Sequence, residues 1–210
     1  MKNYFKFILS LLSLLYFLCF FTYSNDIRSL GIGVDINDID MRGYKDLTCL
    51  KNKNILSEWK DYRKCEMNQQ KLYQISLEYD DRYAVTEEFE GTQVAGHPVL
   101  IHVSVDENGI IEKINVKTDP KAPWYFRKQS YLLWLRIYNK YGSEGWDCLE
   151  KEPLDGHLLV GKKYINKICE KKLNEKIVVL HTEFYFKNNK KDKENLVSRT
   201  SMKIEKNRNI

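Results

Sequence analysis

Hydrophobic and polar residues alternate along much of the chain beyond residue 70, which is the pattern of half-buried β-strands. The clearest example is the sequence PVLIHVSVDENGIIEKINVKTD at 98–119. Its apolar residues lie before and after a DENG sequence whose residues tolerate positive φ: Val99, Ile101, Val103, Val105, Ile110, Ile114 and Val116. We therefore predict a β-hairpin with its turn at 106–109.

Five further stretches have the composition and spacing of strands. Two of them, at 71–79 and 83–94, precede the hairpin, and the GHP sequence at 96–98 predicts a turn between the second of these and the hairpin. The other three come late in the chain, at 163–170, 176–187 and 196–205. The segments at 173–175 and 188–194 connect them, and the charged run in the second is typical of a solvated loop.

Between the two groups of strands, the hydrophobic spacing changes to that of a helix. Pro120 and Pro123 can begin a helix but cannot lie in its interior, and Gly142 is placed to end it, so we predict one helix over 124–141. One broad arc of this helix should face a core: Phe126, Ser130, Tyr131, Leu133, Trp134, Leu135, Ile137, Tyr138 and Tyr141. The opposite arc is polar except for Tyr125 and Leu132, so Leu132 is the one aliphatic residue of the helix that we expect to be exposed.

The order of these elements predicts an α+β fold (ββββ-α-βββ), in which an antiparallel β-sheet of about seven strands packs on one long amphipathic helix. Residues 69–210 would form this domain. Residues 25–68 are more irregular and contain a short predicted helix at 57–64, between Cys49 and Cys65. We expect this segment to be a small, disulfide-bracketed N-terminal appendage.

The first 24 residues have the layout of a secretory signal peptide. Lys2 and Lys6 precede an uncharged run at 7–23, and small residues lie three and one positions before a cut at Asn25. An uncleaved N-terminal anchor is the alternative, because the run approaches the roughly 20 residues that span a bilayer. Cys19 follows Leu18, where a bacterial lipid-attachment site would need a small residue, so we do not expect lipidation. The chain is therefore predicted to be exported to the periplasm or the extracellular space, without membrane contact after cleavage.

The cysteine count agrees with export. If Cys19 leaves with the signal peptide, an even set remains: Cys49, Cys65, Cys148 and Cys169. Three pairings are open, and closure between near neighbours favours Cys49 with Cys65 and Cys148 with Cys169. No C-x-x-C pair occurs, which argues against a zinc site, and an even set leaves no surplus thiol as a nucleophile.

Composition and charge narrow the class of protein further. The chain has 210 residues with a formal net charge of +5, and without residues 1–24 the charge falls to +3. Such a small charge, the lack of a basic aromatic strand motif and the export signal argue against nucleic-acid binding. An apolar fraction of 43% argues against disorder as the dominant state. The bias toward Lys, Asn and Ile is typical of proteins from AT-rich bacterial genomes.

No sequence motif indicates an enzyme or a resident cofactor. The chain contains no G-x-S-x-G elbow, and Glu87, Glu88 and Glu90 are typical of the wet face of a strand rather than of a glycosidase pair. The acidic run at 35–40 does not match a calcium loop, because Ile39 lies where a ligand is needed. The histidines are far apart in sequence, which argues against a metal site: His97, His102, His157 and His181.

Arg127 is the most informative single residue. It lies on the arc that should face the core, and a buried guanidinium needs a partner. Two interpretations remain open: Arg127 lies at the rim of the core and extends to water, or it anchors an anionic group in a pocket between helix and sheet. Arg127 and Leu132 are the residues that we expect at a ligand or partner contact.

These observations favour an exported, non-catalytic globular protein that binds a macromolecule, with an unidentified protein or envelope component as its partner. One alternative is a carrier that holds an apolar or anionic amphiphilic ligand between helix and sheet. A second alternative is a hydrolase whose site is assembled from distant residues.

Overall fold

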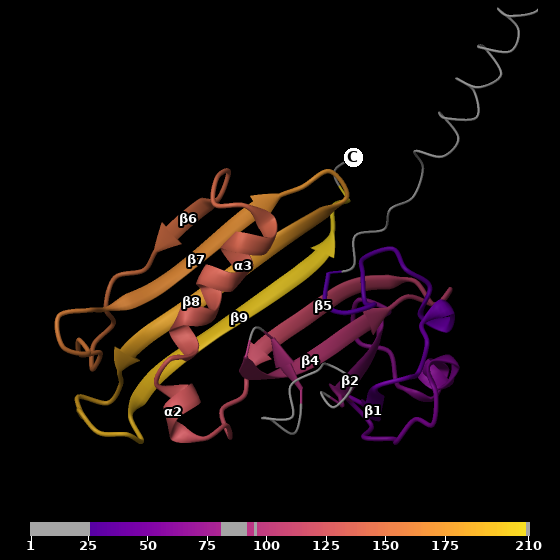
Figure 1. Cartoon of the computed structure of the whole chain (residues 1–210), viewed down its shortest axis with the longest axis horizontal. Helices are drawn as coiled ribbons and strands as arrows, with labels where there is room; N and C mark the ends of the chain where they lie inside the picture. Colours follow the sequence, from indigo (N-terminus) through magenta and orange to yellow (C-terminus); the bar gives the residue numbers. More distant parts are fainter. Residues whose placement is uncertain (1–25, 81–91, 95, 209–210) are drawn as a thin grey trace, which may run out of the picture.

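A single twisted antiparallel β-sheet runs through the part of the chain that the computed structural model describes, which is residues 26–80, 92–94 and 96–208 (Figure 1). The strand order is β1-β2-β4-β5-β9-β8-β7-β6, and the two-residue β3 pairs with β4. The last strand of the chain, β9, therefore lies in the middle of the sheet. The strands are β1 (Tyr44–Cys49), β2 (Tyr73–Tyr79), β3 (Gln93–Val94), β4 (His97–Val105), β5 (Ile111–Thr118), β6 (Asp147–Glu150), β7 (Ile165–Lys172), β8 (Lys176–Phe186) and β9 (Leu196–Lys206).

The hairpin and the late strands confirm the alternation in the sequence. β4 and β5 pair across a turn in which the Asp106 amide donates to the Ile110 carbonyl (3.0 Å) and Gly109 has a φ of +93°. Two strands were not expected: residues 44–49, which we predicted to be irregular, form β1, and residues 147–150 form β6. Most of the predicted strand at 83–94 lies outside the described residues, which include only its end, β3.

The core lies on one face of this sheet. Because the registers are continuous from β4 through β5, β9 and β8, apolar side chains line up in rows across four strands: Ile101, Val116, Met202 and Leu180 in one row, and Val103, Ile114, Ile204 and Val178 in the next. All eight are buried. The helical segment and the chain before β1 cover this face (Figure 1).

The expectation of one long amphipathic helix over 124–141 is wrong. The segment is divided into α2 (Trp124–Arg127), a 3₁₀ turn η4 (Ser130–Leu132) and α3 (Leu133–Tyr141). Gln129, between α2 and η4, has φ −110° and ψ 1°, which is outside the helical region. α3 crosses β7, β8 and β9 (Figure 1), with Leu133 and Ile137 buried against them.

This break changes which side chains are exposed. Leu132, expected to be the exposed aliphatic residue, is half-buried, whereas Leu135, expected in the core, is 44% exposed. A helical wheel assumes 100° per residue without interruption. The non-helical residue at Gln129 and the tighter 3₁₀ turn after it shift the phase of every later residue.

Hydrogen bonds hold the chain before β1 at two places, near α3 and near the β4–β5 turn. Near α3, the buried carboxylate of Asp26 accepts hydrogen bonds from Lys176 (2.6 Å), Tyr141 (3.0 Å) and the Ile32 amide (3.1 Å). Near the β4–β5 turn, the Ile36 amide, in the 3₁₀ helix η1 (Ile36–Asp38), donates to the Gly109 carbonyl (2.8 Å). Residues 26–36 thus pack as part of the core.

Both expected disulfides are present. Cys49 is bonded to Cys65 and ties β1 to the end of the 3₁₀ helix η2 (Trp59–Lys64), which lies where the sequence predicts a short helix. Cys148 is bonded to Cys169, directly opposite in the β6–β7 register, and joins the edge strand to its neighbour. Among the described residues, no helix has the length and apolar character needed to cross a membrane.

Candidate anion-binding site

A pocket lies where β5 ends and β9 continues. β5 pairs with β9 only from Lys117 opposite Ser201 onward, while β9 remains paired with β8 along its whole length. After Thr118 the chain turns away through Asp119 and Pro120 into α2, because the Ala122 amide closes a turn on the Asp119 carbonyl (3.2 Å). The first residues of β9 therefore face α2 and this turn across a gap.

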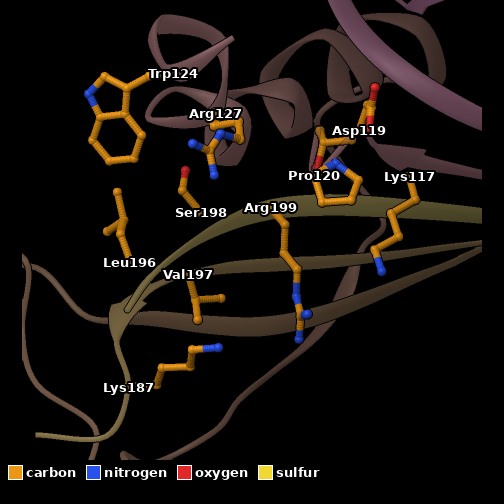
Figure 2. A pocket seen from close by; sticks show the side chains of 11 residues that line it. Lys117, Asp119, Pro120, Trp124, Arg127, Lys187, Leu196, Val197, Ser198 and Arg199 are labelled. Carbon is orange, nitrogen blue, oxygen red and sulfur yellow. The ribbon is translucent and has the colours of Figure 1, made fainter. Parts of the chain in front are cut away.

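The gap is a cavity of about 220 Å³. Figure 2 shows Arg127 and Ser198 on one side of β9, and Val197, Lys187 and Arg199 on its other side. The full lining is Lys117, Thr118, Asp119, Pro120, Trp124, Arg127, Lys187, Leu196, Val197, Ser198 and Arg199. Four of these side chains are cationic and one is a carboxylate, so the pocket is electropositive.

Two buried donors in this pocket have no partner among the described residues: the Nε of Arg127 and the hydroxyl of Ser198. In Figure 2 the guanidinium and the hydroxyl point toward one another across the gap. The Arg127 guanidinium also lies 5.3 Å from the ring centre of Trp124, a cation–π distance that fixes its position without using its hydrogen bonds. A buried donor without an acceptor costs free energy, so both atoms suit a ligand that supplies oxygen acceptors.

The charges around the pocket are only partly neutralised. Within the described part of the chain, Lys117 and Lys187 form no ion pair. Asp119, the one acidic residue of the lining, accepts a hydrogen bond from the Lys121 amide (2.8 Å). An incoming anion would therefore meet Arg127 on one side of β9 and Lys187 on the other, with Asp119 as the single carboxylate of the lining.

Arg199 is the exception, because it pairs with Glu183 on β8, a residue that is only 5% exposed. One carboxylate oxygen of Glu183, Oε2, accepts a hydrogen bond from Arg199 Nε. The other, Oε1, accepts hydrogen bonds from Arg199 Nη2 (2.8 Å) and from the Tyr185 hydroxyl (3.1 Å). Burial by itself would raise the pKa of Glu183, but the hydrogen bond and charge of Arg199, helped by His181 and Tyr185, lower it. Burial and the neighbouring carboxylate raise the pKa of Tyr185 to about 12. Arg199 is thus held at the pocket by a charged partner.

His181 lies beside this pair but does not form a catalytic arrangement with it. Its Nε2 lies 3.0 Å from the amide oxygen of Asn166, and its Nδ1 lies 3.9 Å from Glu183. Burial lowers the pKa of His181, although Glu183 opposes this, so the ring is neutral at pH 7. Both carboxylate oxygens of Glu183 accept hydrogen bonds from Arg199 or Tyr185, so the cluster is an ion pair that joins β8 to β9. This arrangement gives little support to the hydrolase alternative.

The structure separates the two residues that the sequence singled out. Arg127 lines the pocket from α2, between the helical segment and the sheet. The interpretation in which Arg127 anchors an anionic group needs this position. Leu132 lies in η4 and is not part of the lining. The acidic run at 35–40 has local roles, since Asp35 caps η1 by accepting from the Asn37 amide (2.9 Å). Glu87, Glu88 and Glu90 lie outside the described residues.

Sequence reasoning missed the other pocket residues. Lys117, Lys187 and Ser198 come from the ends of three strands that are far apart along the chain, and only the strand order brings them together. The one available signal was that charged residues gather at the predicted strand ends. Over the described ranges, no group of three or more His, Cys, Asp or Glu side chains is arranged to hold a metal ion.

Comparisons with known proteins add no relative to this description: no family model, curated protein or solved structure matches the chain.

Proposed function

We propose that this protein is an exported, non-catalytic binding module that recognises an anionic group of a macromolecular partner in the pocket between α2, β5 and β9. The observation that carries the proposal is the pair of buried, unpartnered donors, Arg127 Nε and Ser198 Oγ, inside an electropositive cavity. Hydrogen bonds from a guanidinium to a carboxylate, sulfate or phosphate are among the stronger polar contacts in proteins.

The size of the cavity favours a macromolecule over a small carried ligand. Pockets that enclose a drug-sized ligand measure roughly 300–1,000 Å³ and are mostly apolar. This cavity, at about 220 Å³, is smaller, and most of its lining residues are charged or polar. It fits a single anionic group, and the remainder of the partner would lie on the surface outside. The carrier alternative therefore has less support, since a long acyl chain needs a larger and more apolar cavity.

Export fits the two disulfides, because such bonds persist in oxidising compartments. Cleavage of the first 24 residues would place the new N-terminus at Asn25, immediately before the buried Asp26. We propose the periplasm or the extracellular space as the location.

The test is equilibrium binding of three probes to the wild type and to Arg127→Ala, at fixed ionic strength. The probes are polyglutamate, a heparin oligosaccharide and palmitate. We expect at least one of the two polyanions to bind, and Arg127→Ala to weaken it about tenfold or more, as expected for a lost hydrogen bond to a charged group.

The matched control is Arg136→Ala, which removes the same charge from an exposed position on α3 outside the pocket. This variant should bind like the wild type, and both variants should keep the melting temperature of the wild type within a few degrees. Equal losses in the two variants would show general charge attraction and contradict the proposal. So would binding of palmitate alone, or of no probe.

A further inference from the structure

The pocket contains an unpaired stretch of sheet edge as well as charges. β9 pairs with β8 from Leu196 to Lys206, but with β5 only from Ser201 to Glu205. The residues from Leu196 to Thr200 therefore have a strand on one side and the pocket on the other. Within this stretch the Leu196 amide donates to the Asp192 carbonyl (3.1 Å) and the Thr200 amide to the Thr118 hydroxyl (3.2 Å), so Ser198 between them is the position where a short extended segment could pair.

The direction of the backbone groups along this edge follows from the ladder. In an antiparallel strand, successive residues direct their N–H and C=O groups to alternate sides. The Asn195 carbonyl accepts from Lys187 on the β8 side, and the Thr200 amide donates to the Thr118 hydroxyl on the β5 side (3.2 Å). Ser198 lies two residues before Thr200, so its N–H and C=O point to the same side of β9 as those of Thr200. They therefore point into the pocket, where no described strand pairs with them.

Ser198 thus offers a backbone donor and a backbone acceptor side by side, next to its own hydroxyl and the Nε of Arg127, neither of which has a hydrogen-bond partner in the described part of the chain. A sulfate group satisfies the donors but leaves the carbonyl without a partner, because at neutral pH it has acceptor oxygens and no donor. An extended peptide supplies both an N–H and a C=O at the spacing of a strand. An acidic side chain on that peptide would then reach Arg127, Lys117 or Lys187.

From this arrangement, and resting on the proposed function, we infer that the partner is a protein with an acidic, extended segment that adds to the edge of β9 at Ser198. Main-chain hydrogen bonds to Ser198 provide the register, and carboxylates facing the pocket provide specificity. The excess of cations over the single Asp119 makes this site select acidic over basic segments.

The first experiment uses backbone N-methylation. The probe is an acetylated and amidated pentapeptide of alternating glutamate and valine, compared with two isomers that are N-methylated at its odd or at its even amides. All three carry the same carboxylates. In an added strand only every second amide faces the edge, so we expect one isomer to bind about tenfold more weakly and the other to bind like the parent. Equal binding of the two isomers, whether strong or weak, overturns the inference.

The second experiment changes the protein. Ser198→Pro removes the amide donor that faces the pocket but not a hydrogen bond to β8, and Ser198→Ala removes only the hydroxyl. We expect Ser198→Pro to lose most binding of the parent peptide and Ser198→Ala to keep most of it. If Ser198→Pro lowers the melting temperature strongly, the isomer comparison on the wild type decides alone. Equal binding by the two folded variants contradicts the inference.

The outcomes separate this inference from the proposed function. If the heparin oligosaccharide binds in an Arg127-dependent way while the peptide does not, the anion site stands and the peptide edge falls. If no anionic probe depends on Arg127, both fall together.

Discussion

Asp26 and Lys176 are the two residues on which the attachment of the N-terminal segment depends most. The Asp26 carboxylate is fully buried and lies 2.6 Å from the ammonium group of Lys176, whose side chain is only 18% exposed. Lys140 also donates to the Asp26 backbone carbonyl. A carboxylate in this position is tolerated only because each neighbour donates to it, since a buried charge without a partner is strongly destabilising.

We predict that Lys176→Met lowers the free energy of unfolding by about 3 kcal/mol, because the buried Asp26 carboxylate then keeps hydrogen bonds from Tyr141 and the Ile32 amide alone, while the Lys140 cation donates to its backbone carbonyl. The control is Lys172→Met, which removes an ion pair to Glu170 between largely exposed side chains. That change should cost less than about 1 kcal/mol. Urea unfolding of the two variants and the wild type measures both values, and similar losses would contradict the prediction.

At the scale of single elements, the sequence predicts what depends on local pattern. The hairpin at 98–119, the three late strands and the two disulfides follow from alternation, turn residues and cysteine spacing, and the structure confirms them. The division of the helix does not follow, because Gln129 is an ordinary helical residue by propensity. Tertiary contacts favour the break: the Thr200 hydroxyl donates to the Ser130 carbonyl (2.9 Å), which an uninterrupted helix would use for its own ladder.

In the candidate site, too, the sequence predicts what depends on local pattern and not what depends on contacts between distant strands. Arg127 could be predicted because its position on the helix conflicts with its charge. Ser198 and Lys117 could not, because their importance comes from β9 lying beside β5, and pairing between distant strands leaves no local mark in a single sequence. A strand order with β9 at an edge would have fitted the same hydrophobic pattern equally well.

The two disulfides attach β6 to β7 and the end of η2 to β1. Cys148–Cys169 closes a loop of 21 residues and Cys49–Cys65 one of 16. Replacing either pair by alanine should lower the free energy of unfolding by about 3 kcal/mol in the chain-entropy account. Urea unfolding of the two double variants measures this, and a loss under about 1 kcal/mol would show that the unfolded chain is already restricted. The intact mass should rise by four hydrogens on reduction.

For the molecule as a whole, the titratable groups of the sheet predict the direction of its pH dependence. Burial lowers the pKa values of His97, His102 and His181 below the ordinary value of 6.5, with nearby cations adding to the effect in each case. As the pH falls, the unfolded chain takes up protons before the folded one does. The free energy of unfolding is therefore not reduced by these histidines above pH 6.5. It decreases as the pH falls from 6.5 toward their pKa values in the folded protein.

We predict that the free energy of unfolding decreases between about pH 7.5 and 5.5, and that His102→Gln makes this decrease smaller. Below this range, the lowered pKa of Glu183 adds a further loss as the pH falls below 4.5. Denaturant unfolding at constant ionic strength gives the profile. A free energy that stays constant down to pH 5.5 would be inconsistent with the burial of these histidines.

The central position of β9 has a consequence for how the chain matures. Within the sheet, the strands β1 to β5 are joined to the strands β6 to β8 through β9, whose eleven residues follow all of them in the chain. Until they arrive, each half carries an uncovered sheet edge and a half-filled core, the type of species that aggregates. By pairing with both β5 and β8, β9 covers two sheet edges at once, so its pairing protects the molecule against edge-to-edge association with other copies.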